Sequence, residues 1–485
     1  MASSAPKDPP GLTFTFKNLG PIDNAELELG DLTIIAGRNN TGKTYLVYTL
    51  YGFLTWWEDW PGPVPFSGAR AHTSAASRWS ARYPVFAKIS EQIAESGHAD
   101  LPLDRDALNG ERRETIAALS RRFSTDGLAR VFSSSPEMFE GASIDVDVAT
   151  TFPWDTQPAE APADTEDTPS IRFDGRSLTV AVDQPGGKKY HPVALRRRLW
   201  RRYLRFLLPE LPADPCVLSA ERFGISLFHR DLDFRKSQLV DLLQKYGDSN
   251  VTDRDFPFRM INEAVGHYAS PVKDNVDYTR SIPDLRNQRS AVYEDGFFND
   301  IKKMMRGYYT ASRNAIVFRS VARGNLGFAI PLHLASSSAR GLSDLYFFLR
   351  HVARRDHLII IDEPESHLDT ANQILLARLL ARLVRRGLKV LLTTHSDYLI
   401  KELNNLIMLS SVFRNKAKTI KKLGYAKDDC IAPERIRAYV AENSSITKCG
   451  FDRFGMDMPN FDKTINEINN VANELAARLA DDETD

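Results

Sequence analysis

The chain has 485 residues, 42% hydrophobic and 26% charged, a balance typical of a folded protein with more than one structural unit. Lys plus Arg and Asp plus Glu each number 63, so bulk charge does not indicate a polyanionic partner, and any nucleic-acid surface must be local. Cys216, Cys430 and Cys449 lie far apart, which excludes a disulfide framework and a cysteine zinc site and favours a reducing compartment.

Targeting signals are not evident. The N-terminal segment MASSAPKDPPG lacks the apolar centre of a secretion signal. No segment approaches the roughly 18 uninterrupted apolar residues of a membrane span. We therefore expect a cytoplasmic protein that does not enter a membrane.

Three strands are predicted within residues 14–36. The segments FTFKNL, NAELELG and LTIIAG are short alternating or apolar runs, separated by turn signals at Gly20-Pro21 and Gly30-Asp31. A helix should follow and end in FLTWWEDWPGPVPF, where prolines stop it. The tryptophans of that segment could form a partner surface, but burial is favoured because aromatic side chains mostly serve packing.

The segment GRNNTGKT, residues 37–44, joins the third strand to this helix. Its spacing, G-x-x-x-x-G-K-[ST], is that of the phosphate-binding loop of nucleotide-binding proteins. In such a loop Lys43 reaches the β- and γ-phosphates and the Thr44 hydroxyl ligates Mg²⁺. The helix start adds its positive dipole end. The remaining candidate phosphate-binding positions are Gly37, Asn39, Asn40, Thr41 and Gly42.

Residues 51–310 are expected to form a large, mostly helical insertion. Helices are predicted over residues 85–140 and again over 227–303. Between them, residues 153–170 are acidic and rich in proline, which indicates an exposed or disordered loop. The segment IRFDGRSLTVAVD, residues 171–183, should form a hairpin that turns at Asp-Gly. Further strands are predicted at AIVFRSV and LGFAIPL.

A basic helix is predicted from Ala194 to Leu211. Its apolar residues follow helical spacing, and arginines cover much of the remaining surface. This surface could bind nucleic acid or an acidic protein. Alternatively it is a solvated face whose arginines pair with the acidic loop nearby. The arginines are Arg196, Arg197, Arg198, Arg201, Arg202 and Arg205.

The segment HLIIIDEPESHLD supplies the second half of the nucleotide site. Leu358 to Ile361 form a continuous apolar run, as expected of a central parallel strand covered on both faces. An acid at the carboxyl end of such a strand projects into the crevice where ligands bind. Asp362 is therefore predicted to hold Mg²⁺ through water, and Glu363 to polarise the water that attacks the γ-phosphate of ATP.

Two further segments add candidate phosphate contacts. His395 ends the apolar strand KVLLTT, where an imidazole can sense a γ-phosphate by hydrogen bonding. In SSSARGLSDL, Ser337, Ser338 and Gly341 precede or begin an apolar helix. Their hydroxyl and N–H groups can bind phosphate, or they can simply cap the helix.

The C-terminal part, residues 411–485, is expected to be a helical tail. The segment DKTINEINNVANELAARLADDETD carries an apolar stripe at helical spacing. This helix either packs on its own head, which we favour, or docks a partner. The stripe consists of Ile465, Ile468, Val471, Leu475 and Leu479.

In order and character these motifs resemble ABC-type ATPases of the SMC and repair-ATPase branch. GRNNTGKT corresponds to Walker A, LIIIDEP to Walker B and TTHS to the segment with the switch histidine. ESHLD corresponds to the D-loop, with Ser366 and Asp369 matching its Ser and Asp. SSSARGLSDL occupies the place of the signature motif but lacks its adjacent glycine pair. The opening 29 residues of the head, LSAERFGISLF and IIIDEPESHLD are similar to OLD-like ATPases of bacterial anti-phage systems, of the Septu and PARIS types.

This resemblance implies an α/β fold, a P-loop ABC-type ATPase head. Residues 1–50 and 311–410 would form the head, and the insertion and the tail would be appended to it. The resemblance further implies a dimer or larger oligomer in which Ser337, Ser338 or Gly341 approaches a γ-phosphate held by another subunit. ATP and Mg²⁺ are the implied cofactors.

The resemblance also implies a function. Such ATPases restrain or deliver a separate nuclease or toxin, and a nucleic acid or a phage protein can be the trigger. About 90 residues follow His395 and contain no Toprim-like strand-ending Glu with a D-x-D pair, so no built-in nuclease is expected. The alternative is a DNA-repair or chromosome-organising ATPase that grips DNA directly. The nucleotide-binding subunit of a transporter fits less well because the insertion is long.

Overall fold

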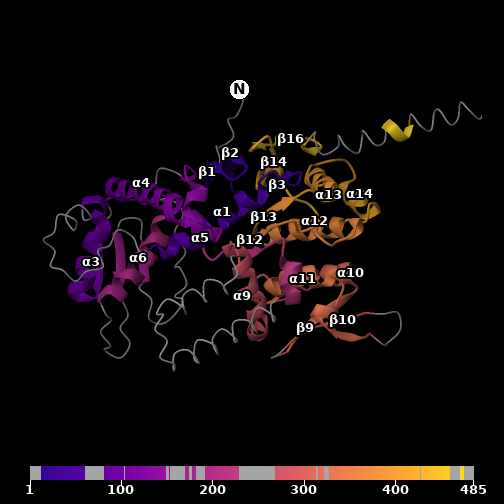
Figure 1. The fold of residues 1–485 in the computed structure, drawn as a ribbon, viewed down its shortest axis with the longest axis horizontal. Coiled ribbons are helices and arrows are strands. Elements are labelled where there is room, and N and C mark those ends of the chain that lie inside the picture. The colour runs from indigo at the N-terminus through magenta and orange to yellow at the C-terminus, as the bar shows by residue number, and fades with distance from the viewer. Residues whose placement is uncertain are drawn as a thin grey trace, which may run out of the picture.

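A nine-stranded sheet forms the centre of the computed structural model (Figure 1). The structure describes residues 12–60, 81–102, 104–148, 152, 170–173, 177–181, 192–228, 268–312, 315–321, 327–426, 428–458 and 470–473. The strand order is β5-β1-β2-β15-β14-β3-β13-β12-β8. The bounds are β1 (Thr13–Leu19), β2 (Ile22–Glu28), β3 (Leu32–Gly37), β5 (Ser143–Asp147), β8 (Cys216–Leu218), β12 (Leu358–Ile361), β13 (Lys389–Thr394), β14 (Ile436–Glu442) and β15 (Ser445–Lys448).

The strands from β14 to β8 run parallel to one another. As predicted from its continuous apolar sequence, β12 is buried along its whole length, and so is β3. Alternating side chains of β3 and β13 divide the core in two, because Ile35 and Leu391 contribute to one hydrophobic cluster while Ile34 and Leu392 contribute to the other. Because β14, β3, β13, β12 and β8 are parallel, their carboxyl ends lie at the same edge of the sheet.

Helices cover both faces of the sheet. The cluster on one face includes residues of α1 (Lys43–Trp56), α3 (Pro84–Ser96), α4 (Arg105–Arg122), α5 (Leu128–Val131) and α6 (Pro192–Leu207). The cluster on the other includes residues of α9 (Ser270–Leu285), α10 (Asp295–Met305), α11 (Ser337–Phe347), α12 (Thr370–Arg385), α13 (Asp397–Met408) and α14 (Lys416–Lys422). In Figure 1, α3, α4 and α6 lie at one end of the molecule and α12 to α14 at the other. None of the helices within the described residues is long and apolar enough to span a bilayer.

Small sheets complete the fold. One joins β4 (His98–Pro102), β7 (Ser177–Ala181) and β6 (Ser170–Phe173). The antiparallel pairing of β6 with β7 confirms the predicted hairpin, whose turn lies outside the described residues. A second sheet joins β9 (Gly307–Ala311), β10 (Ile316–Ser320) and β11 (Ala329–Pro331), and β16 (Phe451–Asp452) pairs with β17 (Gly455–Met456). The strands β10 and β11 confirm those predicted at AIVFRSV and LGFAIPL.

The expected division into head, insertion and helical tail needs correction. The strands β14 and β15 come from the predicted tail, yet β14 pairs directly with the P-loop strand β3. Likewise β5 and β8 come from the predicted insertion but extend the main sheet. These segments are short and become strands through pairing with distant residues, which local patterns do not reveal. The region 85–140, which was predicted to be helical, also contains the strand β4.

Several other expectations can be compared with the described residues. Trp57 and Trp60 are buried and Trp56 is partly buried, and Trp200 Nε1 donates a hydrogen bond to the Trp60 carbonyl at 3.2 Å, so the burial interpretation is confirmed for Trp57 and Trp60. On α6, Arg201 and Arg205 form ion pairs with Glu58 at 3.2 and 2.7 Å. Part of the basic helix is therefore structural, although the acid it uses is not in the predicted acidic loop. Residues 153–169, residues 229–267 of the helical region predicted over 227–303, and most of the C-terminal helix lie outside the described residues.

Candidate functional site

The P-loop lies between β3 and α1. Asn40 and Gly42 have positive φ values of 63° and 85°, which a tight loop of this kind requires. A Cβ at Gly37 would lie 2.6 Å from the Ala441 carbonyl of β14, so glycine is needed at that position by close packing of the sheet. The Thr41 hydroxyl donates to the Arg38 carbonyl at 2.8 Å and closes the loop on itself.

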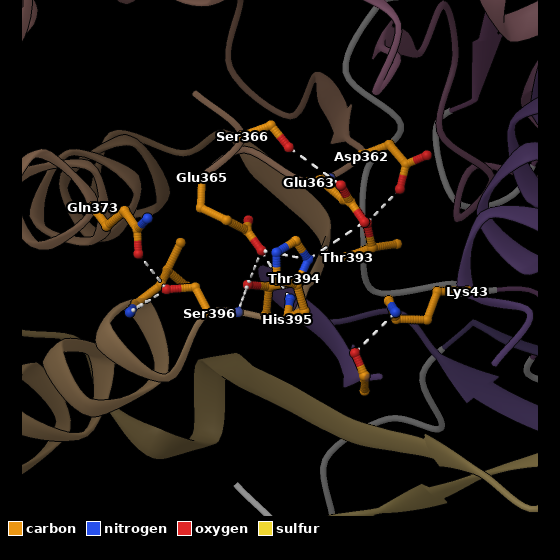
Figure 2. A network of polar contacts seen from close by, with 12 residues as sticks. Lys43, Asp362, Glu363, Glu365, Ser366, Gln373, Thr393, Thr394, His395 and Ser396 are labelled. Carbon is orange, nitrogen blue, oxygen red and sulfur yellow. Dashed lines mark hydrogen bonds and ion pairs between the residues drawn. The ribbon is translucent and has the colours of Figure 1, made fainter. Parts of the chain in front are cut away.

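Lys43 points back across its own loop. Its ammonium donates hydrogen bonds to the carbonyls of Gly37 and Arg38 at 2.9 and 2.7 Å. Burial lowers the pKa of Lys43, while the carboxylates of Glu363, Asp362 and Glu365 favour the charged form. The ammonium thus lies within electrostatic range of the predicted catalytic acids. Figure 2 shows Lys43 extending from the P-loop on the side where these acids lie.

Asp362 joins the two halves of the site. The Thr44 hydroxyl donates to Asp362 Oδ2 at 3.1 Å, a contact between residues 318 positions apart. The Thr393 hydroxyl, at the end of β13, donates to Asp362 Oδ1. The carboxyl is fully buried, and burial raises its pKa to about 6, while the hydrogen bonds from Thr393 and Thr44 lower it. The strand end therefore presents Asp362 to the P-loop, as predicted.

The donor set fits a magnesium nucleotide. Mg²⁺ prefers oxygen ligands and is usually held by one or two carboxylates or hydroxyls together with substrate phosphates. Thr44 and Asp362 supply one hydroxyl and one carboxylate at a single point. Within the described residues, no cluster of three or more Asp, Glu, His or Cys side chains forms a self-sufficient metal site. The arrangement is therefore suited to a cation that arrives with its phosphates.

Glu363 occupies an uncommon backbone conformation. Its φ is 48°, in the left-handed region, and its N–H donates to the Thr393 hydroxyl at 3.0 Å. The Ser366 hydroxyl donates to Glu363 Oε2 at 3.2 Å, and His395 Nδ1 lies 3.4 Å from Glu363 Oε1. The Glu363 side chain is only partly buried, at 28% exposed, so its carboxylate remains accessible to solvent. Such a carboxylate can accept a proton from, or orient, a water molecule.

Glu365 was not singled out from the sequence, although it organises the histidine. It is almost fully buried and accepts hydrogen bonds from the Thr394 hydroxyl and the His395 N–H at 2.7 and 2.8 Å. His395 Nδ1 lies 3.5 Å from the same carboxylate oxygen. Figure 2 shows the His395 ring between the side chains of Glu365 and Thr393. The paired threonines that end β13 were the available sequence signal for this network.

A fourth acid approaches the same strand edge. Glu221 follows β8, and the Tyr48 hydroxyl of α1 donates to Glu221 Oε2 at 2.9 Å. Its charge contributes to raising the pKa of Asp362. Glu221 lies in LSAERFGISLF, a segment noted above only for its resemblance to OLD-like ATPases, and it reaches the site through the parallel pairing of β8 with β12.

The signature-like segment forms the start of α11. Ser336 caps this helix, since its hydroxyl accepts from the Ala339 N–H at 3.3 Å. Ser337 and Ser338 are half-buried and Gly341 is buried. Among the described contacts, no hydrogen bond joins Ser337 or Ser338 to the P-loop of the same chain. The D-loop residue Asp369 caps α12 in the same manner, accepting from the Asn372 N–H at 2.9 Å.

Burial of Asp362 has a consequence for stability. Its folded-state pKa of about 6 exceeds the ordinary value of 3.8, so the protonated form is favoured by folding and stability falls as pH rises through that window. A pKa shift of this size corresponds to a loss of roughly 3 kcal/mol in the free energy of unfolding when the carboxyl is ionised.

We therefore expect Asp362→Asn to raise the melting temperature of the nucleotide-free protein at pH 8 more than at pH 5. Thermal unfolding at the two pH values measures the difference. An equal increase in melting temperature at both pH values, or a larger increase at pH 5, would contradict the conclusion that burial raises the pKa of Asp362.

Comparisons with known proteins give a family match for part of the chain. Residues 261–400 match the family model described as AAA ATPase domain. No curated protein sequence matches the chain. Three similar solved structures are SMC heads, all at low similarity. The Smc head with an extended coiled coil bound to the C-terminal domain of ScpA, from Pyrococcus furiosus, has 11% identity and a TM-score of 0.31, over 95% of this chain and 98% of that chain.

The other two are comparable. The SmcHead bound to the C-winged helix domain of ScpA has 12% identity and a TM-score of 0.32, covering 92% of this chain and 99% of that chain. The SMC head domain from Thermotoga maritima has 10% identity and a TM-score of 0.30, covering 91% and 99%. The segment matched by the family model contains Asp362, Glu363 and His395. The match therefore includes the strand-end half of the site, whereas the P-loop between β3 and α1 lies outside the matched residues.

Proposed function

We propose that the chain is a Mg²⁺-dependent, ATP-hydrolysing switch protein. The observation that carries this proposal is the hydrogen bond from Thr44 to Asp362, which joins a P-loop hydroxyl to a strand-ending carboxylate. The match of residues 261–400 to the AAA ATPase domain supports the same reaction.

Each residue has a role in the proposal. The backbone N–H groups of the loop that includes Gly37, Asn39, Asn40, Thr41 and Gly42 hold the phosphates. Lys43 exchanges its bonds to the loop carbonyls for the β- and γ-phosphates. Thr44 and Asp362 hold the cation, whose charge would offset that of the phosphates.

Hydrolysis itself is assigned to the partly exposed acid. Glu363 orients the attacking water and accepts its proton, while the Ser366 hydroxyl holds the carboxylate in place. His395 lies beside Glu363, with its N–H and Nδ1 both close to Glu365, and is placed to sense the γ-phosphate. Glu365 thus acts as the residue that orients the histidine.

Two substitutions should distinguish nucleotide binding from hydrolysis. Lys43→Ala removes the ammonium that neutralises the phosphates, so ATP binding should be lost. Glu363→Gln preserves shape and removes the carboxylate, so ATP binding should persist while hydrolysis is lost. Calorimetry and phosphate-release assays measure the two properties.

Glu402→Gln is the control for Glu363→Gln, because it makes the same change at a carboxylate that pairs with Arg378, away from the P-loop. It should hydrolyse ATP normally. Unchanged ATP affinity in Lys43→Ala, or wild-type hydrolysis by Glu363→Gln, would refute the assignment of these two residues.

Self-association belongs to the proposal. Ser337, Ser338 and Gly341 have no described contact with the P-loop of their own chain, and they stand at the start of α11 where the signature segment is expected. We expect ATP to produce a dimer or larger oligomer of the Glu363→Gln variant, because this variant cannot hydrolyse ATP and the ATP-bound oligomer therefore does not dissociate. Light scattering that finds a monomer with and without ATP would contradict this.

The cellular role is proposed from the motif resemblance. A chain of this kind would transmit its nucleotide state to a separate nuclease or toxin, with a nucleic acid or a phage protein as trigger, as part of an anti-phage system. The alternative is a DNA-repair or chromosome-organising ATPase that binds DNA directly. The exposed residues Arg196, Arg197 and Arg198 of α6 are a basic surface that suits an acidic effector or a nucleic acid.

Phage challenge of cells that carry the gene with its genomic neighbours distinguishes these roles. Protection should disappear with Lys43→Ala or Glu363→Gln, because the effector then no longer receives the nucleotide signal. Protection that is absent, or indifferent to both substitutions, would favour the repair alternative. In that case the purified protein should bind DNA, and the logarithm of its binding constant should fall linearly with the logarithm of the salt concentration.

A further inference from the structure

Arg222 is a buried residue that follows β8 and begins the helical residues 222–228. It is 4% exposed. Its guanidinium bonds to carbonyl groups of three separate segments. Nη1 donates to the carbonyls of Ser219 and Asp362 at 3.0 and 2.7 Å. Nη2 donates to the Glu363 carbonyl at 2.7 Å, and Nε donates to the Gly341 carbonyl of α11 at 3.2 Å.

These contacts hold the backbone at the end of β12. Glu363 has a left-handed φ of 48°, which a residue with a side chain adopts only when the surroundings enforce it. The guanidinium bonds to the carbonyls on both sides of this residue's N–Cα bond, those of Asp362 and Glu363. The fork geometry of arginine allows this, whereas a lysine ammonium offers one point of attachment. Arg222 therefore fixes the direction in which the Glu363 side chain leaves the strand.

The neighbouring residue extends the same connection. The Phe223 ring lies 4.4 Å from the ring of His367, in the loop after β12, and the Arg340 guanidinium of α11 lies 4.3 Å from the centre of the Phe223 ring. Arg222 and Phe223 thus both contact α11, at Gly341 and Arg340, and both contact the loop that carries Glu363. A displacement of the start of α11 would therefore change the positions of Arg222 and Phe223.

We propose that Arg222, with Phe223, is a positioning residue that couples the placement of α11 to the orientation of Glu363. The proposal rests on the proposed function, in which Glu363 orients the attacking water. Its consequence is that contacts made by the signature-like segment at the start of α11 regulate hydrolysis rather than ATP binding. Neither residue touches the P-loop through any described hydrogen bond, so phosphate binding should not depend on the pair.

The test compares Arg222→Lys with Arg112→Lys. Arg112 is the matched control, since its side chain is fully buried and its guanidinium also bonds to a carbonyl, that of Leu207, but on the opposite face of the main sheet from α11. Arg222→Lys should lower kcat by about 10²-fold, the effect of a misplaced catalytic group, while the Kd for ATP in calorimetry stays at the wild-type value. Arg112→Lys should lower the melting temperature without changing kcat of the folded protein.

Two outcomes would overturn the proposal. One is a wild-type kcat in Arg222→Lys. The other is a parallel loss of ATP affinity in that variant, which would indicate a general collapse of the site. Should Arg222→Lys fail to fold, Phe223→Leu serves instead, because it removes the ring contacts and keeps an apolar side chain. A lowered kcat at constant ATP affinity then supports the coupling, and an unchanged kcat overturns it.

Glu363→Gln, measured in the same series, separates this inference from the proposed function. Loss of hydrolysis in Glu363→Gln together with a wild-type rate in Arg222→Lys refutes the coupling alone. A wild-type rate in Glu363→Gln refutes the proposed function and the coupling with it. Adding Arg222→Lys to Glu363→Gln should not reduce the residual single-turnover rate further, since both changes act on the same carboxylate.

Discussion

The parallel pairing of β3, β13 and β12 is the constraint on which the site depends. Because these strands run in one direction, the P-loop after β3, His395 after β13 and Asp362 after β12 meet at one edge of the sheet. The hydrogen bond from Thr44 to Asp362 and that from Thr393 to Asp362 cross the three strand ends and hold them in register. Residues separated by hundreds of positions are thus brought together in a single candidate site.

Concentrating acids at this edge has an electrostatic cost that the protein offsets with hydroxyl groups. Asp362 and Glu365 are both buried, and each accepts a hydrogen bond from one of the two threonines that end β13. Lys43 supplies the nearby positive charge, yet in this structure its ammonium bonds to loop carbonyls rather than to the acids. This arrangement is consistent with the proposed ligand, a nucleotide that brings both cation and phosphate.

The site residues that could be predicted from the sequence belong to motifs that are contained in short, contiguous segments. The P-loop and the strand ending in Asp362 and Glu363 combine continuous apolar runs with specific polar residues, and each pattern lies within about a dozen positions. In contrast, β14 owes its place beside β3 to pairing across roughly 400 positions, so the predicted helical tail was wrong for that segment. Glu365 and Arg222 were missed as site residues because their bonds, to hydroxyls, N–H groups and carbonyls, leave no spacing in the sequence.

The central claim is that Thr44 and Asp362 hold a divalent cation that is bound to ATP phosphates. Electron paramagnetic resonance of Mn²⁺ in place of Mg²⁺, recorded on the protein mixed with ATP, tests this claim most directly. We predict a protein-bound Mn²⁺ signal with hyperfine coupling to ³¹P that is lost in Thr44→Ala. A bound Mn²⁺ without ³¹P coupling, or a coupling that persists unchanged in Thr44→Ala, would contradict the account.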